Sequence, residues 1–214
     1  MNEDIIPVTY MSGTGGNFLC HLIVSAKQNN KTITLSEYGN VHFTGFKDIP
    51  GPPWGVDRAD IDKINMILTT TPRTNLKPYY TIGHIVNVDL LSQYFKKFIR
   101  IIYDEDDIDE ITRVFVGKWG IDGENLKNSP AHLNYYLFEN RNRTEFYMNY
   151  FSYDEKYNES LFVTWKELYH LESNILINKL HSFTNIPVEN FSTDMIQTWR
   201  NGTTLGLEKL NNLL

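Results

Sequence analysis

Residues 7–22, PVTYMSGTGGNFLCHL, carry the clearest fold signal in the chain. The short apolar run Ile5–Tyr10 is typical of a buried strand. Glycine follows at Gly13, Gly15 and Gly16, and it lets the backbone take positive φ and approach a ligand closely. Apolar residues at helical spacing come next, so a helix is predicted to begin where the glycines end.

A strand-to-helix turn of this kind can hold an anion. The start of a helix presents unpaired N–H groups and a partial positive charge, which together favour a phosphate or sulfate group. The alternative is a tight turn that needs glycine and binds nothing. No Gly-Lys-Ser/Thr follows the glycines, so the common P-loop pattern is absent, and their spacing does not give the dinucleotide pattern G-x-G-x-x-G.

The rest of the chain alternates strand and helix patterns, which predicts βαβ units, a mostly parallel sheet and one α/β domain over residues 1–214. Further strands are predicted at 79–84, 98–103 and 160–164. Helices are predicted at 88–95, 108–119, 131–151, 165–183, 193–200 and 205–214. The helix at 165–183 is assigned a core stripe of Leu168, Leu171, Ile175, Leu176 and Leu180.

Composition narrows the class of protein. The chain has 214 residues, 41% hydrophobic and 21% charged, which suits one globular domain. Its net charge of −6 argues against a nucleic-acid partner. No apolar run has the roughly 18–20 residues of a membrane span, and no leader is recognised, so a cytoplasmic protein is expected. The single cysteine, Cys20, is predicted to be a buried structural thiol.

Several polar residues are predicted to share one edge of the sheet. Ligands of parallel sheets bind beyond the carboxyl ends of the strands. The turn at 11–17 and His84 both follow predicted strands, so they are expected to share a crevice. Tyr103 ends a third strand and is interpreted as a core or rim aromatic, while Asp104–Asp109 is interpreted as a solvated helix start. No metal site is predicted.

In this order, the motifs resemble those of the sulfotransferase family of the P-loop fold. That family's first loop, Pro-Lys-Ser-Gly-Thr-Thr, is similar to residues 10–16 at Ser-Gly-Thr. A strand ending in Thr-His-Leu-Pro, then Leu-Leu, then another strand is similar to residues 82–103. The late pattern Val-x-Tyr-Glu-Asp-Leu is similar to residues 163–168. The resemblance spans most of the chain and implies a three-layer P-loop NTPase-like architecture.

The resemblance implies an enzyme that transfers a sulfuryl group from 3′-phosphoadenosine-5′-phosphosulfate (PAPS) to a hydroxyl or amine acceptor. His84 is the implied catalytic base. The acceptor is expected to be a small molecule or a glycan, bound by loops 40–78 and 120–150, and the Tyr-rich helix 131–151 could also line its pocket. The residues predicted to bind the donor are Ser12, Gly13, Thr14, Gly15, Gly16, Asn17 and Arg200.

Two departures from the family pattern concern charge. The family's loop lysine falls on Met11, and the arginine that binds the 3′-phosphate falls on Tyr103. Losing a cation that neutralises developing charge costs orders of magnitude in rate. The candidate substitutes for these cations are Arg73, Lys77, Arg100 and Arg200. The alternatives are therefore a non-catalytic relative of the same fold and a kinase-like nucleotide-binding protein. The sequence does not predict the oligomeric state.

Overall fold

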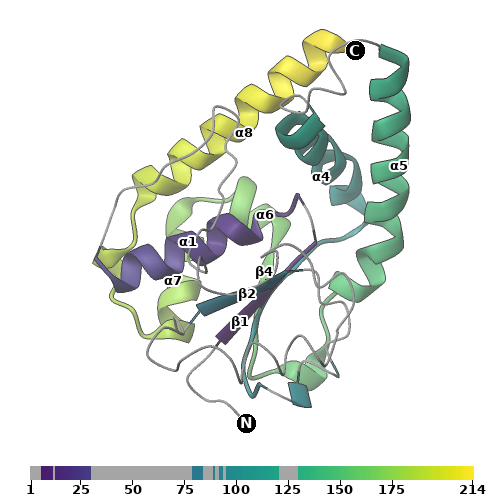
Figure 1. Cartoon of the computed structure of the whole chain (residues 1–214). Coiled ribbons are helices and arrows are strands. Elements are labelled where there is room, and N and C mark those ends of the chain that lie inside the picture. Colours follow the sequence, from purple (N-terminus) through teal and green to yellow (C-terminus); the bar gives the residue numbers. More distant parts are fainter. Residues whose placement is uncertain are drawn as a thin grey trace, which may run out of the picture.

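A computed structural model describes residues 6–11, 13–29, 79–83, 89, 92, 93, 95–120 and 130–214. The strands are β1 (Ile6–Thr9), β2 (Tyr79–Gly83), β3 (Ile99–Ile102) and β4 (Leu161–Thr164). The α-helices are α1 (Gly16–Lys27), α4 (Ile108–Phe115), α5 (Pro130–Met148), α6 (Trp165–Tyr169), α7 (Ser173–Thr184) and α8 (Thr193–Leu213) (Figure 1). Short 3₁₀ turns are η1 (Glu105–Asp107), η4 (Asn149–Phe151), η5 (Glu155–Tyr157) and η6 (Val188–Asn190), and η2 (Val116–Gly120) is a π-helical turn.

The sheet is parallel throughout its described strands. The strand order is β2-β1-β3-β4, with Val8 opposite Ile99 and Ile99 opposite Leu161. The predicted α/β class with a parallel sheet is therefore confirmed. From β1 the chain moves to β2 on one side, and from β2 it crosses back past β1 to β3 on the other side, so the topological switch point lies between β1 and β3. In open α/β sheets, this is where ligands bind.

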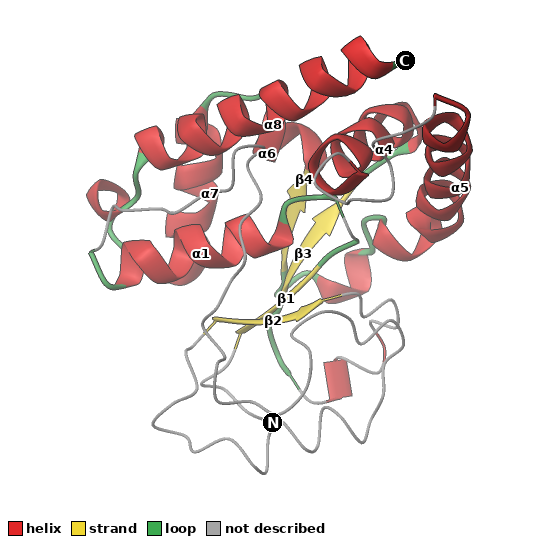
Figure 2. Ribbon diagram, turned by 45° about the horizontal axis from the view of Figure 1, so that its top comes forward, coloured by secondary structure: helices red, strands yellow, loops and turns green. Residues whose placement is uncertain are grey.

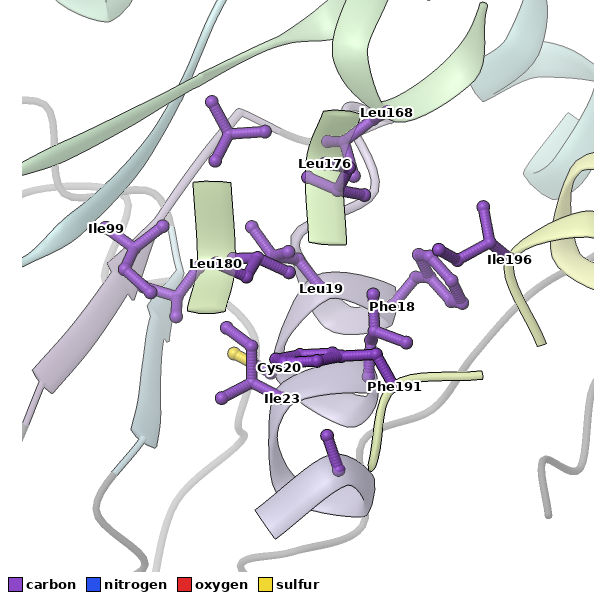
Figure 3. Packing of buried hydrophobic residues seen from close by; sticks show 14 of the residues in the cluster. Phe18, Leu19, Cys20, Ile23, Ile99, Leu168, Leu176, Leu180, Phe191 and Ile196 are labelled. Atoms are coloured by element: carbon purple, nitrogen blue, oxygen red, sulfur yellow. The ribbon is translucent and has the colours of Figure 1, made fainter. Parts of the chain in front are cut away.

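The main core lies between the sheet and α1, α7 and α8, which occupy one side of the strands (Figure 2). Phe18, Leu19 and Cys20 of α1 belong to the same buried cluster as Leu176 and Leu180 of α7 (Figure 3). Each fully buried Leu or Phe side chain contributes about 1.5–3 kcal/mol through lost contact with water. Cys20 is fully buried, as predicted for a structural cysteine.

Aromatic side chains and one arginine occupy the opposite face of the sheet. Phe98, just before β3, contacts Phe162 of β4 and Tyr157 of η5 edge-on, and Tyr153 also packs on Phe162. Arg100 points to this face and is fully buried. Within the described part of the chain, the segment 149–157 covers this face with 3₁₀ turns, whereas α-helices cover the first face.

The helix predicted at 165–183 is two helices, because the chain turns between α6 and α7. Thr164 and Glu167 form a capping box that starts α6, and a helix begins again at Ser173. Leu171 and Ile175 are about 40% exposed (39% and 42%), so they do not belong to the core stripe assigned to them. Periodicity alone did not reveal the break, because no proline or glycine marks it.

The two C-terminal helices predicted at 193–200 and 205–214 are one helix, α8. Gly202 and Gly206 both lie inside it. Gly117 of η2 allows a close approach to this helix, since a methyl group added at Gly117 would lie 2.9 Å from the Gly206 carbonyl oxygen. The helix predicted at 108–119 ends at Phe115 and continues as the π-turn η2. The predicted helix at 88–95 and the loops at 40–78 lie largely outside the described residues.

Candidate functional site

The turn after β1 has the backbone shape that its glycines require. Gly13 and Gly15 have φ of 91° and 87°, in the left-handed region that glycine adopts without steric cost. Thr14 closes the turn, because its N–H and its hydroxyl both donate to the carbonyl of Met11, at 3.1 and 2.6 Å. The Thr14 hydroxyl is therefore engaged in holding the turn.

Aromatic side chains approach this turn closely. A methyl group added at Gly13 would lie 2.9 Å from Cβ of Phe115, and one at Gly15 would lie 2.8 Å from Cη2 of Trp199. The interpretation of the glycines as residues of a tight turn thus has a direct packing basis. Each one makes room for a neighbouring ring or chain, whether or not a ligand binds nearby.

The first turn of α1 lies beside these rings. The N-cap is Gly15, without a side-chain cap, and the first turn contains no acidic residue. The leading N–H groups of a helix have no intrahelical partner. Asn17, interpreted from sequence as an N-cap or amide donor, lies inside the helix and accepts a hydrogen bond on Oδ1 from the hydroxyl of Tyr10, at 2.8 Å.

A buried lysine, Lys118, lies next to the turn and was missed by the sequence argument. It belongs to η2 and is 5% exposed. Its ammonium donates to the hydroxyl of Tyr169 at 3.1 Å, and that hydroxyl reaches the carbonyl of Gly13 at 3.4 Å. Lys118 also lies 4.6 Å from the centre of the Trp199 ring, whose edge closes over Gly15.

The surroundings of Lys118 are aromatic and almost dry. Trp199 stacks on Phe18 at 4.1 Å, so the ammonium lies over the other face of the indole. Burial lowers the pKa of Lys118 to about 7, because a charge loses hydration there. Burial raises the pKa of Tyr169 well above its ordinary value, and the negative charge of Glu110 makes a smaller contribution in the same direction. A bound anion would restore the charged form of the lysine. The sequence gives little indication of this role, because Lys118 lies in the last turn of the predicted helix 108–119, where solvent-exposed lysines are common.

The two positions where the family has cations form a neutral pair. The Tyr103 hydroxyl donates to the carbonyl of Thr144 at 2.8 Å and lies 3.0 Å from the sulfur of Met11. Both side chains are buried in one cluster with Phe151 and Trp165. Tyr103 is therefore a core aromatic, as predicted. This cluster holds the start of the glycine turn in place without supplying charge.

The arginines considered as substitutes are engaged elsewhere. Arg200 donates to the carbonyls of Leu168 and Glu167, at 2.8 and 3.1 Å, and so caps the end of α6. Arg100 donates to the carbonyl of Tyr150 and lies 4.6 Å from the centre of the Phe151 ring. Burial lowers the pKa of Arg100 to about 9. Segment 200–206, compared from sequence with a nucleotide-binding loop, is helical.

A histidine–glutamate pair adjoins the same cluster. Glu110 of α4 contacts Nε2 of His170 at 2.8 Å and accepts a long hydrogen bond from Trp165 Nε1 at 3.5 Å. Trp165 stacks on Tyr169 with ring centres 3.6 Å apart, and so connects the pair to the residue that touches Gly13. The sequence argument placed His170 within a continuous helix and gave it no role.

His84 and Ser12 lie outside the described residues, as do Arg73 and Lys77. The strand before His84 is described. In the pairing of β1 with β2, Thr9 is opposite Gly83, so β2 ends beside the last residue of β1. The prediction that His84 shares an edge with the glycine turn is compatible with this register and remains a prediction.

Comparison with protein-family models, with curated proteins and with solved structures gives no match. The class that the described residues define is an α/β protein with a small parallel sheet and a glycine turn at its switch point. Among those residues, no helix is both long and apolar enough to cross a bilayer. The same part of the chain has no group of three His, Cys, Asp or Glu side chains arranged to hold a metal ion.

Proposed function

We propose that the chain binds a phosphate- or sulfate-bearing nucleotide at the β1–α1 turn and transfers a sulfuryl group from PAPS to a hydroxyl acceptor. The observation that carries this proposal is the position of Lys118 beside a glycine turn at the sheet's switch point. The family resemblance supplies the donor and the reaction type. A three-layer sulfotransferase architecture and a cytoplasmic location belong to the same proposal.

The donor's phosphosulfate would accept hydrogen bonds from backbone N–H groups at the start of α1. These N–H groups point out of the helix end, where the helix dipole is positive, and both features favour an anion. Gly13 and Gly15 are partly exposed and would present their main chain to the ligand, whereas Gly16 is buried. Asn17 would contribute its side-chain amide. Lys118 would take the place of the family's loop lysine from a different part of the chain. Thr14 supports the turn, because its hydroxyl is bonded to Met11.

In the proposed reaction, the acceptor oxygen attacks sulfur while the bond from sulfur to the bridging phosphate oxygen breaks. The acceptor's proton passes to the imidazole of His84, the base that the resemblance implies. The other product is adenosine 3′,5′-bisphosphate. Lys118 would stabilise charge on the leaving phosphate, where a cation in a dry site has a large effect on the rate.

A second candidate function, nucleotide binding without chemistry, is favoured by the neutral contact between Met11 and Tyr103. At the two positions where the sulfotransferase family has a lysine and an arginine, this chain has the buried residues Met11 and Tyr103. The Tyr103 hydroxyl donates to the Thr144 carbonyl and lies against the Met11 sulfur. A kinase-like protein, the third alternative, would also place a lysine in the loop itself.

Isothermal titration with PAPS and with adenosine 3′,5′-bisphosphate tests the proposal. We expect both to bind, and Lys118→Met to weaken both. If neither nucleotide binds at millimolar concentration, nucleotide binding is overturned. If both bind, a sulfuryl-transfer assay with His84→Ala follows. Loss of transfer with retained affinity supports the enzyme, whereas no transfer by the unmodified chain to any hydroxyl acceptor selects the non-catalytic function.

A further inference from the structure

Helix α5 exposes aromatic side chains on the side turned away from the core. Its inner side packs on α4 and η2, for example through Leu133, and the helix lies along the outer edge of the molecule (Figures 1 and 2). We call the exposed set the aromatic stripe. It consists of Tyr135 (60% exposed), Phe138 (62%), Phe146 (65%), Tyr150 (46%) and Tyr153 (58%).

Tyr135, Phe138 and Phe146 follow one face of α5, and Tyr150 of η4 and Tyr153 continue the stripe beyond its end. Tyr135, Phe138, Asn142, Phe146 and Asn149 are three or four positions apart, the spacing that puts residues in one line. Folded proteins seldom leave so many large aromatic side chains together in water, and such patches usually mark an interaction surface.

A hollow of about 500 Å³ lies within the stripe and is lined by Asn142, Glu145, Phe146, Asn149 and Tyr150. Asn142, Glu145 and Phe146 of α5 and Asn149 at the start of η4 have the spacing i, i+3, i+4 and i+7. This is the arrangement that receives a side chain of a facing helix in knobs-into-holes packing.

We propose that the aromatic stripe is the interface of a homodimer, in which two α5 helices pack antiparallel about a two-fold axis at Asn142. Phe138 and Phe146 are both four positions from Asn142, on opposite sides. The axis therefore brings Phe138 of each copy over Phe146 of the other and into the hollow beside it. The two Asn142 amides meet on the axis, where each can donate to and accept from the other.

Charges on the two flanks of the stripe fit this pairing. Glu139 and Arg143 lie on one flank, and Arg141 and Glu145 lie on the other. A two-fold axis in the plane of the interface puts like flanks together and reverses their direction. Glu139 then comes opposite Arg143 of the second copy, and Glu145 comes near its Arg141. Arg141 also forms ion pairs with Asp109 and Glu145 of its own chain, at 2.8 and 3.1 Å.

The available area fits a weak dimer. A large aromatic side chain has about 150–250 Å² of surface, and the five stripe residues are about half exposed or more, so roughly 600 Å² is available on each copy. The total of roughly 1,200 Å² lies at the lower limit of specific interfaces. We therefore expect reversible association in the micromolar range rather than an obligate dimer.

Sedimentation velocity over micromolar to hundreds of micromolar chain tests association. Phe146→Asp should weaken dimerisation by about 30-fold or more, because it places a charge against an aromatic anchor. Leu205→Asp is the matched control, since Leu205 is 51% exposed on α8 and outside the stripe. A monomer at all concentrations, or equal effects of both substitutions, would overturn the proposal.

Disulfide formation tests the geometry. Asn142→Cys should form a disulfide-linked dimer under mild oxidation, because the axis passes through that position, whereas Asn149→Cys should not, since the two copies would be about 20 Å apart there. Cys20 is buried and does not compete. Equal cross-linking at both positions would exclude this axis. Arg143→Glu should also weaken association, and adding Glu139→Arg should restore it. Failure of that rescue would contradict the pairing.

Discussion

The ammonium of Lys118 lies 4.6 Å from the centre of the Trp199 ring, and the edge of that ring closes over Gly15. One indole thus connects a buried cation to the backbone of the glycine turn. Because the π-turn η2 carries the lysine and α8 carries the tryptophan, contact between these two elements sets the charge near the candidate site.

Replacing Lys118 by Met should change how stability depends on pH. The pKa of Lys118 is about 7 in the fold and ordinarily 10.5, so between these values the unfolded chain binds a proton that the native chain lacks. Linkage then makes the native state more stable as pH rises through this window, by up to about 1.4 kcal/mol per pH unit. Lys118→Met lacks this contribution.

Urea unfolding of both proteins at several pH values between 7 and 9.5 measures the difference. We expect the stability of the original chain relative to Lys118→Met to increase with pH. Subtracting the variant removes titrations that both proteins share, such as those of surface lysines. A constant difference across the window would show that Lys118 keeps an ordinary pKa.

Replacing Gly15 by Ala should destabilise the fold by about 2–4 kcal/mol. A residue that has a Cβ atom loses about 1–2 kcal/mol of stability when its backbone is in the left-handed region. Crowding in a packed core costs about 1–3 kcal/mol more. The added methyl group would lie 2.8 Å from Trp199, at φ 87°. Chemical denaturation measures the loss of stability. In a Trp199→Leu background the crowding is relieved, so Gly15→Ala should cost less there. An equal cost in both backgrounds would assign the effect to φ alone.

Replacing Tyr103 by Phe should lower the free energy of unfolding by about 1–2 kcal/mol. The substitution removes a buried hydroxyl and leaves the Thr144 carbonyl without that donor. Tyr153→Phe is the matched control, because the Tyr153 side chain is 58% exposed and its loss of a hydroxyl should change stability by less than about 0.5 kcal/mol. Thermal and urea unfolding give both values. Equal effects would show that the Tyr103 hydroxyl has no structural role.

Replacing Arg200 by Met separates its two roles. If the guanidinium mainly caps α6 through the carbonyls of Leu168 and Glu167, the variant should lose about 1–2 kcal/mol of stability and keep its affinity for adenosine 3′,5′-bisphosphate. Lys156→Met is the control, because the ion pair of this cation with Asp89 is exposed and screened by water. A loss of nucleotide affinity at unchanged stability would assign Arg200 to the ligand instead.

Elements with a local signal were predicted well from the sequence. The runs that form β3 and β4 are apolar and β-branched, and the glycines after β1 have the positive φ expected at Gly13 and Gly15. The break after Tyr169 and the continuity of α8 were predicted wrongly. Leu171 has the right spacing for a core stripe but is 39% exposed, and Gly202 sits within a helix.

The site was predicted in part. Residues 13–17 lie at a strand's carboxyl end, as the alternation of strands and helices predicts. No pattern pointed to Lys118, Tyr169 or His170, because each lies in a segment whose helical periodicity explains it without any functional role. The exposed aromatic stripe of α5 was also ambiguous, since Tyr and Phe occur on both sides of that helix.

The glycine turn depends on residues adjacent in the chain, so an apolar strand, three glycines and an apolar helix suffice to specify it. The burial of Lys118 depends on contacts between segments that are far apart in the sequence. The backbone of Gly117 must approach Gly206, and Trp199 must stack on Phe18, before the ammonium loses its water. The desolvation of Lys118 arises from such packing, so it cannot be predicted from the residues next to Lys118 in the sequence. The local pattern therefore determines where an anion could bind, whereas the tertiary structure decides which charge faces it.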